Sequence, residues 1–481
     1  MKLRSALGYS TLSLILAAQP VPAQAAGPHP AKPDPPAIPE NFNAAQNYPA
    51  ATVTAESLAD QAWWKIFNDP LLDSYVERAR NRNSSIQEAA ARLEKSRALL
   101  RGAAAERMPE LGGRGFATRQ SGPLINEAGG GGTLINSALS LSYEIDILGR
   151  LSKAKRAARL DAAASADLLR NARLLVEADT AQAYFELVAL DEERSVLVQA
   201  ADDQRAALKI VEGRLGNGLA TGLAVSRART EVATLESDIA DLDRRRADVA
   251  GGLSLLMGEA PSELEVRSGL GNPPIVPADI PSVIIARRPD ITAGLRSVEA
   301  AEARVGVAKT SWLPNLGLTG ERGFASSALQ SLLGSATQNF GLGLLFSIPG
   351  LDGGRYKARV RGARADLSIA SAQYGTQLLT AFRDVDNQLS AVRILGERAN
   401  TLSTIADDDR SLAATLQARY ANGLISQLDY VDGQRVVLEH RRTEVQIKFA
   451  RYVATIALIR ALGGGWGTPA NPAPQIASAG H

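Results

Sequence analysis

The chain has 481 residues, with 53 basic and 51 acidic side chains, three histidines and no cysteine. This near balance of charge argues against a nucleic-acid-binding protein. Without cysteine we expect no disulfide, no thiolate metal site, no cysteine nucleophile and no lipid anchor built on an N-terminal cysteine. Three histidines leave little room for a histidine metal centre, so no cofactor is expected.

Residues 1–25 have the pattern of an export signal. Lys2 and Arg4 precede an apolar stretch at residues 11–18, and the small residues Ala23 and Ala25 follow. That stretch is too short to span a bilayer, and no later run reaches the roughly 20 apolar residues that a membrane helix needs. We therefore expect export without a helical anchor, and an extended, proline-rich leader at residues 26–60.

The first structured segment is predicted at residues 61–260 and begins with a helix. Asp69 and Pro70 are typical of a helix start, so a helix or kinked pair is predicted from Leu71 to Arg107. Trp63 and Trp64 lie just before it. We expect both indoles to pack this helix against the body of the protein.

Two β-hairpins are predicted, near residues 110–147 and 315–350, because the apolar period changes to two there. Seven apolar side chains share one face of these hairpins: Leu139, Leu141, Tyr143, Phe340, Leu342, Leu344 and Phe346. Two hairpins are too few to close a barrel. Either they form a small sheet on the helices, or several chains pool them. The export signal and strands of about ten residues favour an outer-membrane barrel with these seven side chains facing lipid.

Long helical hairpins follow each pair of strands. The helix from Arg150 to Arg214 would be about 97 Å long if unbroken, and the chain then bends near residues 214–221. Apolar rows seven residues apart predict helices supercoiled side by side. Arg246, Arg435 and Arg442 interrupt these rows, which favours a helical wall with one wet face.

A linker, a second repeat and a C-terminal tail are predicted after the first repeat. Residues 261–288 are a proline-rich linker, and the second repeat is predicted at residues 289–462 with its long hairpin bending near 419–426. Asp290 is expected to cap its first helix, and His440 is interpreted as a solvated surface histidine. Residues 463–481 are expected to form a flexible tail.

The two predicted repeats share one register of 205 positions. The bend RLGNGLATGLAVSR at residues 214–227 matches RYANGLISQLDYVD at residues 419–432. The same offset pairs Gly149 with Gly354 and Asn217 with Asn422. Array repeats have periods of about 20 to 50 residues, so this pattern indicates a duplicated half-domain.

Four motifs carry a family resemblance: Trp-Trp followed by FNDPLL, RRPDI at residues 287–291, LPNL at residues 313–316, and the paired Asn-Gly bends. Together they resemble the TolC-type outer-membrane efflux factors, over roughly residues 60–462. The Trp-Trp opening is most similar to the nodulation-protein-T branch that serves tripartite drug pumps.

The resemblance implies a mostly α member of the α+β class with an internal duplication. Three chains would pool four strands each into an outer-membrane β-barrel, which a long periplasmic α-helical barrel continues. The implied partners are two further copies of the chain, a periplasmic adaptor, a proton-driven inner-membrane pump and outer-membrane lipid, with no nucleic acid. The implied function is the exit duct of a tripartite efflux pump in a Gram-negative bacterium, exporting small toxic compounds or drugs. Many relatives in this branch are lipoproteins, and the chain departs from them because it has no cysteine; we expect its barrel alone to hold it in the outer membrane.

The resemblance also assigns site residues at the helical tips. A periplasmic gate falls on Asp429 and Asp432, with Tyr420 at the bend, while Ile425 stands where the family has an arginine. Residues i and i+3 share a helix face, so three copies would place six carboxylates around one axis and favour cations. Alternatively, Asp429 serves as the capping-box partner of Ser426.

The exposed bend residues form a second candidate site, for the adaptor. These residues are Gly218, Leu219, Ala220, Gly423, Leu424 and Ile425. The two glycines are expected to adopt left-handed backbone geometry. The alternative is that the apolar members only pack each hairpin against itself.

Three rival functions are weaker. A type I protein-secretion duct would use the same fold, and a periplasmic coiled-coil scaffold or adaptor would not need the amphipathic strands. An enzyme is not expected, since no P-loop, nucleophile with a histidine partner or metal cluster is present in the sequence.

Overall fold

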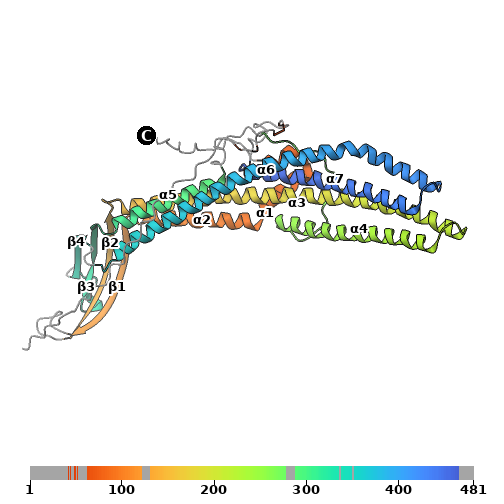
Figure 1. Ribbon diagram of the computed structural model, residues 1–481. Coiled ribbons are helices and arrows are strands. Elements are labelled where there is room, and N and C mark those ends of the chain that lie inside the picture. The colour runs from red at the N-terminus through yellow and green to blue at the C-terminus, as the bar shows by residue number, and fades with distance from the viewer. Residues whose placement is uncertain are drawn as a thin grey trace, which may run out of the picture.

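The computed structural model describes residues 62–121, 131–277, 288–334, 337–348 and 352–464, together with residues 42, 44, 48, 49 and 51. The predicted export signal, most of the leader, residues 278–287 of the linker and the tail beyond residue 464 lie outside the described residues. The described chain is elongated, with a sheet at one end of a helical bundle and two helical bends at the other (Figure 1). In these described parts, no helix combines the length and apolarity needed to cross a membrane.

The helices and strands repeat in pairs. The first repeat contains α2 (Ser84–Ala105), β1 (Glu110–Ser121), α3 (Arg150–Gly216) and α4 (Gly222–Leu256). The second contains α5 (Pro289–Thr310), β3 (Asn315–Ser326), α6 (Arg355–Ala421) and α7 (Gln427–Ala461). Each of these elements begins 205 residues after its counterpart, and α3 and α6 both have 67 residues, or about 100 Å. The duplication predicted from the sequence is therefore present in the fold.

The four strands form one antiparallel sheet in the order β1-β2-β3-β4. β2 (Gly131–Ile145) pairs with β1 over twelve residues, and β4 (Gln338–Ser347) pairs with β3 over ten. β2 also pairs with β3, with Leu141 opposite Gly320 and Tyr143 opposite Leu318. The two predicted hairpins therefore share a single sheet, and a short 3-10 helix, η4 (Leu329–Ser331), lies between β3 and β4.

A kinked helix pair begins the first repeat, as the sequence predicts. The Asp69 carboxylate accepts hydrogen bonds from the amides of Leu71 and Leu72 at 3.1 and 3.3 Å, which starts α1 (Pro70–Arg82). Asn83 then ends α1 and caps α2 through bonds to the amides of Ser85 and Ile86. The chain turns at this asparagine because it interrupts one helix and starts the next.

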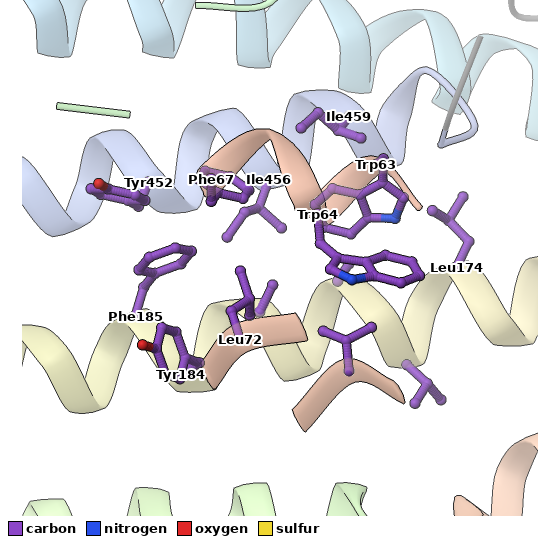
Figure 2. Close-up of a cluster of buried hydrophobic side chains, with 14 of the residues drawn as sticks. Trp63, Trp64, Phe67, Leu72, Leu174, Tyr184, Phe185, Tyr452, Ile456 and Ile459 are labelled. Atoms are coloured by element: carbon purple, nitrogen blue, oxygen red, sulfur yellow. The ribbon is translucent and has the colours of Figure 1, made fainter. Parts of the chain in front are cut away.

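The largest core lies where α1, α3 and α7 meet. Trp63 and Trp64 in η2 (Trp63–Phe67) are each 1% exposed, which confirms that the indoles plug the N-terminal helix into the body. Phe67, Phe185 and Tyr452 complete this aromatic cluster, with ring centroids 4.2 to 5.7 Å apart (Figure 2). Burial of several large rings fixes how the two repeats pack together.

Two local predictions need correction. Pro289 is the first residue of α5, so Asp290 lies inside the first turn and is not the N-cap residue. Its carboxylate pairs with Arg288 at 2.7 and 3.0 Å and accepts from the first-turn amide of Ile291 at 2.9 Å. His440 is more than a solvated surface residue. Its Nδ1 lies 3.0 Å from a carboxylate oxygen of the buried Asp409, so it joins α7 to α6.

Candidate functional site

The two helical bends have the same backbone structure. Gly218 and Gly423 both have a φ of +73°, the left-handed geometry that glycine adopts without strain. The amides of Leu219 and Leu424, the next residues, donate to carbonyls five residues back at 2.8 and 2.9 Å. These are Schellman motifs, which end a helix and reverse the chain.

The apolar residues of the bends divide into two classes. Leu219 and Leu424 are 78% and 73% exposed. Ala220 packs against buried residues of its own hairpin, and Ile425 packs against the cluster that contains Tyr420. The bends therefore present one leucine each to their surroundings, while the following residue stabilises the hairpin.

The first hairpin is tied to the second through Arg214. Its Nη2 donates to the main-chain oxygens of Tyr420 at 2.6 Å and Ala421 at 3.3 Å, the last residues of α6. Its guanidinium carbon also lies 5.0 Å from the centre of the Tyr420 ring. A cation at the carbonyl end of a helix complements the helix dipole, so this contact holds the two tips together within one chain.

Tyr420 is buried between the hairpins and does not project freely from the tip. Only 2% of it is exposed, and its ring stacks on Tyr430 with centroids 4.5 Å apart. Burial raises the pKa of Tyr420, against the opposing effect of the nearby Arg214. Tyr420 thus packs against the first turn of α7.

Asp429 takes part in the predicted capping box. Its amide donates to the Ser426 hydroxyl at 3.1 Å, and its carboxylate accepts from the Ser426 amide at 3.2 Å. Asp432 lies one turn further along α7 and is exposed. Within the described chain, the Asp432 carboxylate makes no hydrogen bond or ion pair. The two carboxylates thus share a helix face, but only that of Asp429 is held by hydrogen bonds within the described chain.

The seven apolar side chains predicted to face lipid lie on one face of the sheet. Directly paired residues of an antiparallel sheet point to the same side, and the register places Leu318 between Tyr143 and Leu344, and Gly320 between Leu141 and Leu342. Exposure is highest on the outermost strand, β4, where it runs from 61% to 87%; the members there are Phe340, Leu342, Leu344 and Phe346.

Charged residues on the sheet are mostly on the opposite side. Arg114 and Glu321 form an ion pair of 2.7 Å on that side. Among the described strand residues there are two exceptions: Arg322, which the register places between Leu139 and Phe340 on the apolar face, and Arg119, which pairs with Thr133 on that face. A long side chain of this kind can extend its charge away from an apolar layer.

The arginines that interrupt the apolar rows form ion pairs between helices. Arg246 holds Asp191 at 2.6 and 3.1 Å, and Arg442 lies 2.9 Å from the buried Glu193. Arg435 pairs with Glu231 of α4, which joins the two hairpins. The sequence showed these arginines but not their partners, which lie up to 249 positions away.

Sequence reasoning also missed the roles of Arg214 and Tyr430. An arginine precedes each Asn-Gly bend by three residues, and this repeated spacing was the available signal. The contacts of each arginine depend on which hairpin lies beside it, and the local spacing does not reveal that.

The match to a protein-family model reflects the duplication of the chain. The family model described as outer membrane efflux protein matches the chain twice, at residues 75–259 and 280–464. The pyoverdine export outer membrane protein OpmQ of Pseudomonas putida is 30% identical over 86% of this chain and 90% of its own length. The cation efflux system protein CusC of Escherichia coli is 28% identical over 89% and 93%, respectively.

Solved structures share the fold. The outer membrane protein VceC of Vibrio cholerae superposes with a TM-score of 0.78 at 26% identity, over 85% of this chain and all of that one. The outer-membrane channel OprN gives 0.79 at 27% identity, over 91% of this chain. The chain therefore belongs to the outer membrane efflux protein family, whose members are non-enzymatic channels and outer-membrane components of efflux pumps.

Proposed function

We propose that three copies of this chain form the exit duct of a tripartite efflux pump, with four strands each in one twelve-stranded barrel. The observation that carries this proposal is the open sheet. Among the described strands, β1 and β4 each have only one neighbour, so both outer edges are unpaired. An exposed edge beside an apolar face favours pairing with further strands, and threefold assembly closes the ring without leaving an edge.

The helical hairpins would continue this barrel as a periplasmic tunnel. Their tips are the proposed docking surface for an adaptor, formed by Gly218, Leu219, Ala220, Gly423, Leu424 and Ile425. The exposure of Leu219 and Leu424 favours these two as the contact residues, with the others shaping the bends. An inner-membrane pump, proton-driven as the resemblance to the drug-efflux branch implies, would supply the energy.

The proposed gate is a ring of six carboxylates, from Asp429 and Asp432 of each copy. Asp432 is the freer group, because Asp429 also stabilises the first turn of α7. Tyr420 would act from behind the ring by holding Tyr430 and the start of α7 in place. Such a ring attracts cations and repels anions at the narrowest point.

The remaining assignments complete this proposal. Residues 1–25 would direct export and be removed, and the barrel would then hold the protein in the outer membrane without a lipid anchor. Residues 61–260 and 289–462 would form the two repeats, joined by the segment 261–288. The resemblance to drug-efflux ducts leads us to propose small toxic compounds or drugs as cargo, with no recognition of cargo by the duct. The names of two relatives mention pyoverdine and cations.

The proposal is tested by expressing the full chain in a Gram-negative host that lacks its own efflux duct but keeps the adaptor and pump of a tripartite efflux system. We expect a heat-modifiable trimer that only detergent extracts from the outer membrane, and restored resistance to small toxic compounds. A water-soluble monomer would rule the duct out. Export of a protein substrate with no gain in resistance would instead favour type I secretion.

A further inference from the structure

The Arg214 contact has a counterpart that is incomplete within one chain. Arg419 lies 205 residues after Arg214, at the same place before its bend. Its side chain is exposed, and among the described residues it has no hydrogen bond or ion pair. Two arginines in matching positions thus differ in one respect: only the first has a helix end within reach.

The acceptors for such a contact are also duplicated. Arg214 binds the carbonyls of Tyr420 and Ala421, and the matching carbonyls of the first repeat belong to Leu215 and Gly216. The Tyr420 oxygen accepts from the Gly423 amide and from Arg214 together, since a carbonyl has two lone pairs. The Leu215 oxygen accepts from the Gly218 amide in the same way, which leaves room for one more donor.

The burial of apolar side chains near the tips also differs between the two repeats. Ala207 of α3 and Tyr420 of α6 are 5% and 2% exposed where the first hairpin meets the second. The matching residues of the other repeat, Leu412 and Leu215, are 39% and 41% exposed. Positions buried between the hairpins of one chain are therefore uncovered on the two outer sides, where a neighbouring copy would stand.

We propose that Arg419 of each copy binds the carbonyl ends of Leu215 and Gly216 in the next copy, and so closes the ring of six tips. The proposal rests on the homotrimer proposed above. The ring alternates between an Arg214 contact within a chain and an Arg419 contact between chains. Because Leu215 replaces Tyr420, the contact between chains consists of charge-assisted hydrogen bonds without an aromatic ring.

The absence of cysteine makes a direct test possible. Leu219→Cys allows one nitroxide label per copy on the full-length trimer in detergent, and pulsed electron spin resonance then measures the distances between copies. Adding Arg419→Ala is expected to give longer and broader distances. Arg419→Lys, which keeps the charge without the planar fork, should give an intermediate distribution.

Arg410→Ala is the matched control. Arg410 is an exposed arginine of the same helix, but it pairs with Asp407 of its own helix, so its loss should leave the distances unchanged. Equal distributions in Arg419→Ala and Arg410→Ala trimers would overturn the proposed contact and leave the duct intact. If the labelled parent chain forms no trimer, the proposed function fails as well.

Discussion

The indole Nε1 of Trp63 donates a hydrogen bond of 3.1 Å to Oε2 of Glu177, 114 positions along the chain. The other carboxylate oxygen of Glu177 lies 3.2 Å from Nε of Arg80. A carboxylate is thus enclosed beside the aromatic core, with one hydrogen bond and one ion pair. This arrangement stabilises the N-terminal helix against α3, and it makes that attachment sensitive to pH.

Glu177 should make the stability fall as pH rises. Burial raises its pKa to about 7, against the opposing effects of Arg80 and Trp63. Between its ordinary pKa of 4.5 and about 7, the unfolded chain binds fewer protons than the folded chain, so the free energy of unfolding decreases through this window. The full effect is on the order of 3 kcal/mol.

Glu177→Gln removes this titration. Its apparent melting temperature in detergent should rise relative to the parent protein as the pH increases from 5 to 8. A difference that stays constant over this range would contradict the assignment.

Trp63→Ala should strongly destabilise the helical body. It removes a side chain that is 1% exposed. The cavity left by replacing a buried tryptophan with alanine lowers the free energy of unfolding by about 3 to 5 kcal/mol. Trp312→Ala is the control, because Trp312 is 57% exposed. Chemical unfolding followed by tryptophan fluorescence should separate the two variants; similar midpoints would show that the buried indole is not a structural plug.

The ion pair of Arg442 should contribute more to the free energy of unfolding than the ion pair of Arg435. Arg442→Ala leaves the buried Glu193 without its partner, which costs about 3 to 5 kcal/mol. Arg435→Ala breaks an ion pair whose arginine is 61% exposed, and should cost less than about 1 kcal/mol. Combining Arg442→Met with Glu193→Gln is expected to recover most of the loss. Urea unfolding of all four proteins provides the measurement.

Replacing each of the two gate aspartates should have a different effect on stability. Asp432→Ala should reduce the cation preference of single channels in planar bilayers without a loss of stability. Asp429→Ala should reduce it too, and should also cost about 0.5 to 2 kcal/mol through the lost cap. Asp408→Ala, at an exposed position on α6 away from the tip, serves as the control. Unchanged selectivity in the double variant of Asp429 and Asp432 would remove the gate assignment.

The two faces of β4 should respond differently to charge. Leu342→Arg places a cation on the apolar face and should cost about 2 to 4 kcal/mol if that face meets lipid. Gly341→Arg adds the same group to the opposite face, where a new Cβ meets nothing within 4 Å. We expect the heat-modifiable trimer in outer-membrane fractions for Gly341→Arg and little of it for Leu342→Arg. The reverse result would place the lumen on the apolar side.

The sequence by itself determined the repeating elements of this protein. The long helices, the parity of the strands and the left-handed glycines depend on neighbours a few residues away, and residue patterns record such short-range preferences directly. The 205-residue register of the two halves is a property of the sequence as well, and the fold preserves it.

Only the tertiary structure decided which side chains meet between those elements. The partner of Arg442 is Glu193, and the ring beneath Arg214 is that of Tyr420; neither pairing follows from local spacing. Each depends on how far one helix is rotated and shifted along another, and that is set by side-chain packing along the whole length of the helices. The same reason explains His440, whose carboxylate partner comes from a different helix.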